Sequence, residues 1–214
     1  MSIAVTALEQ ARPHRAAPIV DLCIVFLASA LVYLFEGVAI DLGWFEVGTE
    51  ARGASAVVAG ALAAVTVVLW RGGSLRDLGF KRPQRWLLLP FQALAVLMAF
   101  VAMQTLVPQV IALLVEIPEP DMSRYASVTG NLEAAISMAL ILPLTASIPE
   151  EIIYRGFLMG RLSRLLGTDP RGDVLTVLIQ ALIFASVHFT WGIGGVTMTC
   201  LLYTSDAADE SSRV

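Results

Sequence analysis

The sequence predicts an all-α membrane protein, a polytopic bundle of transmembrane helices with five spans and an incomplete sixth. Of its 214 residues, 57% are hydrophobic and only 15% are charged, and the mean hydropathy is +0.76. One soluble core cannot hide that much apolar surface. Several stretches also approach the roughly 20 apolar residues that cross a bilayer. Lipid is therefore the expected solvent for much of the chain.

The five predicted spans follow from the length of each apolar run. The first run exceeds the roughly 7–15 apolar residues of a signal peptide, so we expect it to remain as a span. A polar-faced helix over 149–166 is expected between the fourth and fifth spans, and a sixth run ends in acidic residues before it can cross. The predicted spans lie at 18–40, 54–70, 86–115, 132–148 and 174–189.

The distribution of basic residues predicts the orientation in the membrane. The loop at 71–85 carries five basic residues, whereas the loops at 41–53 and 116–131 carry one each. The positive-inside rule places the 71–85 loop and the N-terminus in the cytoplasm. Since orientation already explains these basic residues, nucleic acid is not an expected partner. Membrane lipid is the expected surrounding, and the sequence predicts no oligomeric state.

Two adjacent carboxylates, Glu150 and Glu151, follow the fourth predicted span. Ionisable groups at membrane depth cost roughly 2.5–3.5 kcal/mol on insertion scales, so they need partners or water. Arg155 lies four residues after Glu151, which allows the two to pair along one helix face. Glu150 points about 100° away on the same helix. Two carboxylates in different surroundings can differ in pKa, and one can then act as a general base.

A structural interpretation of the same residues remains open from the sequence. Ser147 and Glu150 have the spacing of a capping box, and Pro149 suits the first turn of a helix. Acidic residues at that position would also complement the helix dipole. The segment by itself favours neither the capping role nor the catalytic one.

His188 lies near the end of the fifth predicted span, four residues after Phe184 and on the same helix face. A lone histidine in a membrane helix is commonly a hydrogen-bonded contact between helices. Neutral imidazole is also a frequent metal ligand and can orient a water molecule. His188 is thus a second candidate for the site.

Taken together, Glu-Glu-x-x-x-Arg at 150–155 and Phe-x-x-x-His at 184–188 resemble the first two motifs of a known family. The family is the CPBP intramembrane metalloproteases, also called the CAAX protease and bacteriocin-processing or Abi-type family. The Leu-Gly-Phe-Lys-Arg-Pro segment at 78–83 is also similar to members of this family. The resemblance covers about 71–195, and each motif is short, so their order and spacing add weight.

The resemblance implies a metal-dependent endopeptidase of the CAAX-protease type. In it, Glu150 would activate the water that attacks a peptide bond, while Glu151 and Arg155 brace the site. It implies zinc or another divalent metal, with Glu150 and His188 as metal ligands. The implied substrate is a membrane-associated peptide or protein, and the implied location is the bacterial cytoplasmic membrane.

The family's third motif, His-x-x-x-Asn or His-x-x-x-Asp, does not occur in this sequence. The other histidine, His14, precedes the first predicted span. Because a catalytic zinc normally takes three protein ligands, we expect the 214-residue chain to bind metal weakly and to be inactive. The run that begins at Cys200 resembles a translated transposase adapter, so we interpret the natural sequence as truncated after about Thr199.

This interpretation divides the chain into four regions. They are a cytoplasmic tail at 1–17, N-terminal spans at 18–115, a truncated CPBP protease core at 132–199 and a non-native tail at 200–214.

Two other functions stay open. A non-catalytic membrane protein of the same fold, for bacteriocin self-immunity or as a scaffold, would need no third motif. A small transporter could use Glu150, Glu151 and His188 as a proton relay. The transporter ranks last because the sequence lacks the paired broken helices that inverted repeats produce.

Overall fold

The structure is a computed structural model that describes residues 16–44, 49–81, 83, 85–113, 123–189, 192 and 196. All regular elements in these residues are helical, and none is a strand. The predicted all-α class is therefore confirmed. Helices suit this sequence because each one satisfies its own backbone N–H and C=O groups, which lipid cannot do.

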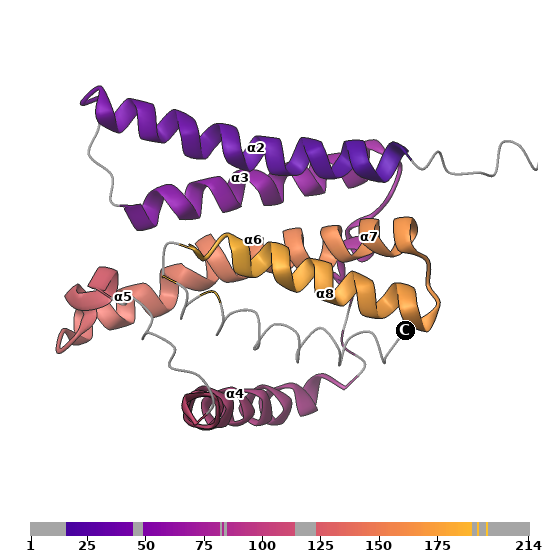
Figure 1. Cartoon of the computed structure of the whole chain (residues 1–214). Coiled ribbons are helices and arrows are strands. Elements are labelled where there is room, and N and C mark those ends of the chain that lie inside the picture. The colour runs from indigo at the N-terminus through magenta and orange to yellow at the C-terminus, as the bar shows by residue number, and fades with distance from the viewer. Residues whose placement is uncertain are drawn as a thin grey trace, which may run out of the picture. The chain divides into compact units, whose positions relative to one another are not determined.

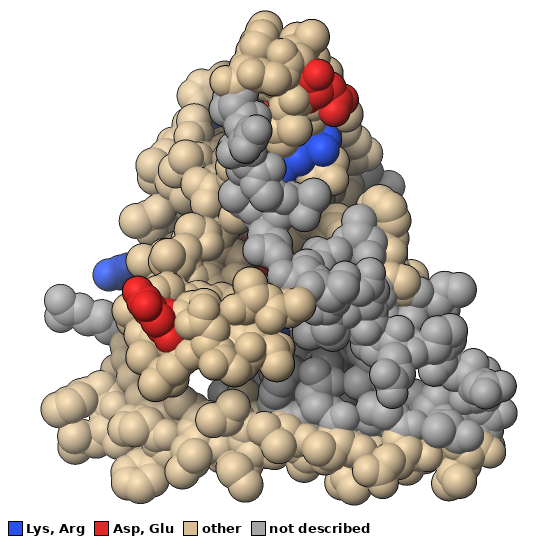
Figure 2. All heavy atoms as spheres, turned by 90° about the vertical axis from the view of Figure 1, so that its left-hand side faces the viewer, with Lys and Arg blue, Asp and Glu red and all other residues tan. Residues whose placement is uncertain are grey.

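Three of the described helices are long and apolar enough to cross a membrane, judged by length and composition. They are α2 (Ala16–Asp41), α3 (Thr49–Trp70) and a continuous helix over Leu132–Leu166. These helices coincide with the first, second and fourth predicted spans. Figure 2 shows few Lys, Arg, Asp or Glu side chains among the described atoms on the face in view, as a lipid-facing surface requires.

The fourth predicted span and the polar helix after it form one helix, so the prediction of two separate helices was wrong. Sequence rules end a helix at proline, which lacks the N–H of the i→i−4 bond. Here Pro143 opens one π-helical turn and Pro149 precedes another, and local π adjustments re-pair the backbone groups that proline frees. The successive segments are α5 (Leu132–Leu142), η4 (Pro143–Ser147), α6 (Ile148–Glu150), η5 (Glu151–Leu158) and α7 (Met159–Leu166).

The remaining predicted spans are matched in part. α4 (Leu89–Ala112) follows the short turn η2 (Trp86–Leu88) and falls within the third predicted span. α8 (Pro170–Ser186) has 17 residues, fewer than the roughly 20 that span a bilayer, so the fifth span stays a prediction. Two 3₁₀ turns, η1 (Leu75–Leu78) and η3 (Ser123–Val128), lie in connecting segments. The predicted sixth run lies outside the described residues.

The chain divides into two compact units. The first comprises residues 1–79 and 138–173, and the second comprises 80–137 and 174–214. Within the first unit, α2 and α3 run side by side (Figure 1). Gly60 marks their close approach, because a Cβ there would collide with Oγ of Ser29 and lie 2.9 Å from Cδ1 of Ile153. Small residues at such contacts let membrane helices pack tightly.

Candidate functional site

The residues of the first motif lie in the middle of the Leu132–Leu166 helix. Glu150 ends α6, and Glu151 begins η5. Nη1 of Arg155 lies 3.1 Å from Oε1 of Glu151 and donates a hydrogen bond to Oε2 at 3.1 Å. The predicted pair four residues apart is thus confirmed. Glu150 is half-buried and Glu151 is exposed, so the two carboxylates do differ in their surroundings.

The capping interpretation of Ser147 and Glu150 is wrong. The backbone of Ser147 is helical, with φ −58° and ψ −51°, and its side chain makes no capping hydrogen bond. A cap residue instead stands outside the helix and supplies a partner to an unpaired N–H at its start. Since no helix begins here, neither a cap nor the helix dipole accounts for Glu150.

The π-helical segment η5 buries one face, and of its other residues only Glu151 is exposed. Its buried face consists of four residues, Ile153, Tyr154, Phe157 and Leu158. The ring of Tyr154 packs against Phe26 of α2, with 6.3 Å between the centroids. π-Helical turns are rare and occur frequently at functional sites. The packing against α2 therefore holds in place the turn that carries the first motif.

The loop that contains η1 packs directly on this turn through Gly156. A Cβ on Gly156 would lie 2.6 Å from the carbonyl oxygen of Leu78, the last residue of η1. The loop is held by the N–H of Ser74, which donates to Oδ2 of Asp77 at 2.7 Å, and by Gly79 at φ +88°. Sequence reasoning missed this contact. An isolated glycine inside a helix was the available signal, because such a residue commonly has a packing reason.

Replacing Gly156 with alanine should destabilise the protein by about 1–3 kcal/mol, the usual effect of overpacking. The added methyl group meets a backbone oxygen, which cannot rotate away as a side chain can. The apparent melting temperature of the purified protein in detergent measures the effect. Gly160→Ala is the matched control, because that position has open space around it and alanine favours helix. Equal melting temperatures for the two variants would contradict the proposed contact.

The second motif lies at the end of α8. His188 follows the helix in a turn, and its N–H donates to the carbonyl oxygen of Ala185 at 3.0 Å. Nδ1 of His188 lies 2.9 Å from the carbonyl oxygen of Phe184, and the two rings are 4.8 Å apart between centroids. Phe184 and His188 are thus in contact as predicted, but His188 lies past the end of α8 and not on the helix face that the sequence predicted. Because a carbonyl only accepts, Nδ1 is the donor, and Nε2 of a neutral ring keeps the lone pair that binds metals.

The two motifs belong to different compact units, Glu150 to the first and His188 to the second. Within the described ranges, no three His, Cys, Asp or Glu side chains form a group that could hold a metal ion. Carboxylate oxygen and imidazole nitrogen are donors that zinc accepts. The donor types therefore fit a metal, but the described residues do not complete the usual set of three. His14 and Cys200 lie outside the part of the chain that is described.

Residues 132–205 match the family model of the type II CAAX prenyl endopeptidase Rce1-like proteins. The match begins with α5 and includes both motifs. Over these residues the chain is similar to the CAAX-protease family. No curated protein and no solved structure matches it. This match supports a protease in general, and with the long apolar helices it supports an integral membrane location. The roles of Glu150, Glu151, Arg155 and His188 stay predictions.

Proposed function

We propose that this protein is an intramembrane endopeptidase of the CPBP type that hydrolyses peptide bonds in membrane-associated peptides or proteins. The position of Glu150 carries the proposal. Its half-buried carboxylate stands in the middle of a long apolar helix, beside a π-helical turn, with no helix start to cap. Charged groups at such depth are rare and commonly functional. The family match over the same helix supports a hydrolytic role.

In the proposed reaction, Glu150 acts as the general base. Its carboxylate takes a proton from water as the water oxygen bonds to the scissile carbonyl carbon. The C–N bond then breaks, and the proton passes from Glu150 to the leaving amine nitrogen. Arg155 pairs with Glu151, which compensates the second carboxylate and leaves Glu150 in the role of base. His188 would orient the water or the metal through Nε2.

Zinc or another divalent metal is part of this proposal. When bound, such an ion would polarise the scissile carbonyl and acidify the water. In the chain described, Glu150 and His188 offer the donor atoms, and any further ligand would come from elsewhere in the protein. We further propose a bacterial cytoplasmic membrane location with a cytoplasmic N-terminus, which rests on the basic loop at 71–85.

Chelation should abolish cleavage if the protease is metal-dependent. The protein is produced from the source gene up to its own stop codon, and it is incubated with a farnesylated CAAX peptide and with an unmodified transmembrane peptide. We expect 1,10-phenanthroline to stop cleavage and added Zn²⁺ to restore it. The isomer 1,7-phenanthroline, which cannot chelate, is the matched control. Cleavage that persists in 1,10-phenanthroline would contradict the proposed metal dependence. A protein that cleaves neither peptide would favour the immunity or scaffold alternative.

A further inference from the structure

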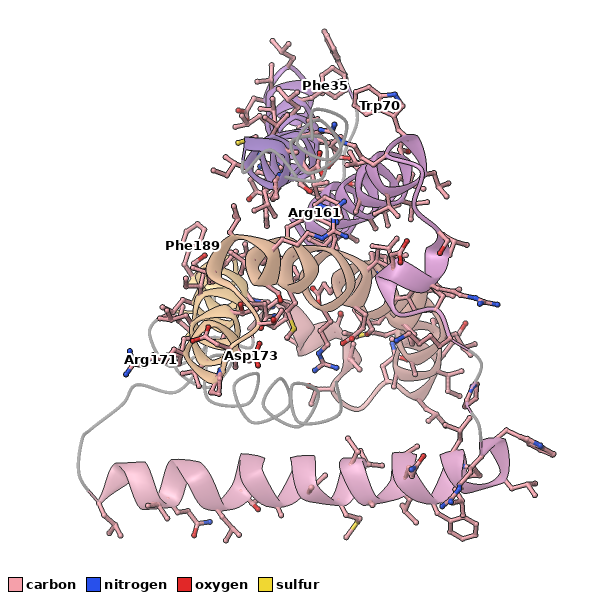
Figure 3. The ribbon with its side chains drawn as sticks, turned by 90° about the vertical axis from the view of Figure 1, so that its right-hand side faces the viewer. Phe35, Trp70, Arg161, Arg171, Asp173 and Phe189 are labelled. Carbon is pink, nitrogen blue, oxygen red and sulfur yellow. The ribbon has the colours of Figure 1, made fainter. Side chains whose placement is uncertain are left out.

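A cluster of three charged side chains joins three helical segments within the first unit. Asp21 of α2 accepts hydrogen bonds on Oδ1 from Nε and Nη2 of Arg71, at 3.0 and 2.8 Å. Its Oδ2 accepts from Nε of Arg161 at 3.0 Å. Figure 3 shows the side chain of Arg161 extending from α7 toward α2 and α3. One carboxylate thus holds two guanidinium groups.

This cluster has more positive than negative charge. The side chains of Asp21 and Arg161 are only 5% and 7% exposed, whereas that of Arg71 is 41% exposed. Arg164 lies three residues after Arg161, about one turn further along α7, and is exposed. Among the described residues, Asp21 is the only acidic partner bonded to Arg71 or Arg161. The buried pair of Asp21 and Arg161 is balanced in charge, so the surplus positive charge lies on Arg71 and Arg164, at the exposed side of the cluster.

The cluster lies where the apolar helices end. Arg71 directly follows Trp70, the last residue of α3, and its guanidinium lies 5.3 Å from the indole ring. Trp70 is 74% exposed, and exposed tryptophan is typical of the membrane–water interface. Asp21 lies in the second turn of α2, at the same end of the helix pair. This is the level at which lipid phosphates are found.

We propose that the Asp21–Arg71–Arg161 cluster, together with Arg164, binds the phosphate of an anionic phospholipid headgroup. Guanidinium groups bind phosphate oxygens in a two-pronged geometry, and Arg71 is exposed enough to do so while it pairs with Asp21. Basic pockets between membrane helices on the cytoplasmic side bind such headgroups. The lipid supplies the negative charge that Asp21 alone does not. The proposal does not depend on proteolytic activity.

Phosphatidylglycerol retention by the purified chain tests the site. The chain is exchanged into nanodiscs of phosphatidylcholine with or without phosphatidylglycerol, and bound lipid is counted by native mass spectrometry after release. Arg164→Gln removes surplus charge but leaves both ion pairs of Asp21 in place, so the fold should persist. We expect phosphatidylglycerol affinity to fall about fivefold. This change corresponds to the roughly 1 kcal/mol that one basic residue contributes near an anionic membrane surface.

Arg76→Gln is the matched control. Arg76 is exposed in η1, and its replacement removes the same charge at a position outside the cluster. Affinity should be unchanged in this variant. An equal fall in both variants would show diffuse surface attraction and overturn the site. Competition by inorganic phosphate at the concentration of the lipid would assign the cluster to a free anion instead of a headgroup, and would also overturn the proposal.

Discussion

Replacing Asp21 with asparagine should lower the free energy of unfolding by about 3 kcal/mol. Removing one partner of a buried ion pair commonly costs 3–5 kcal/mol, because the other charge is left uncompensated. Here Arg161 is buried and would lose its carboxylate, whereas the half-exposed Arg71 can turn toward water. The effect should therefore lie at the lower end of that range. It is measured by titration of the purified protein with a denaturing detergent.

Asp41→Asn provides the matched control. Asp41 is exposed at the last residue of the same helix, and the substitution makes the same change of charge. We expect a change within about 0.5 kcal/mol, as for most surface positions. A loss in Asp21→Asn no larger than in Asp41→Asn would mean that the cluster does not hold α2, α3 and α7 together. Replacing Asp21 by leucine and Arg161 by methionine together should recover part of the loss, since neither charge is then left alone.

Glu150→Gln should reduce peptide cleavage by about 10²–10⁴-fold, the usual contribution of a positioned general base. Glutamine keeps the shape of the side chain but cannot accept the proton of the attacking water at neutral pH. The rate is measured on the protein read to its own stop codon, with the substrate at saturating concentration. Circular dichroism and gel filtration of the variant should match those of the parent, which separates a catalytic loss from a folding defect.

Glu133→Gln is the control for this second experiment. Glu133 stands exposed in the first turn of α5, at the start of the same continuous helix. Its replacement should leave the cleavage rate within about twofold of the parent's. That change is small, because a tenfold change in rate corresponds to about 1.36 kcal/mol in the activation barrier. Substantial cleavage by a well-folded Glu150→Gln protein would exclude Glu150 as the base, and the endopeptidase mechanism proposed above would then be wrong.

The parts of the site that could be predicted from the sequence are local. Glu151 and Arg155 pair because residues four apart on a helix are neighbours whatever the rest of the fold does. Phe184 and His188 also contact each other, through the turn that follows the end of α8. The same local reasoning failed at Ser147, where the pattern of a capping box occurs without a helix start. A capping pattern specifies which bonds are available to a helix end, but the surrounding structure decides whether the helix ends there.

By itself, the sequence determined the membrane class, the positions of the long apolar helices and the two short motifs. Apolar length and charge spacing are properties of one segment, so they can be read without knowing its neighbours. The tertiary structure alone decided that the Leu132–Leu166 helix runs through Pro149, that Leu78 packs on Gly156, and that Asp21 joins Arg161, which is 140 residues away. Such contacts depend on which helix faces meet, and no single segment carries that information.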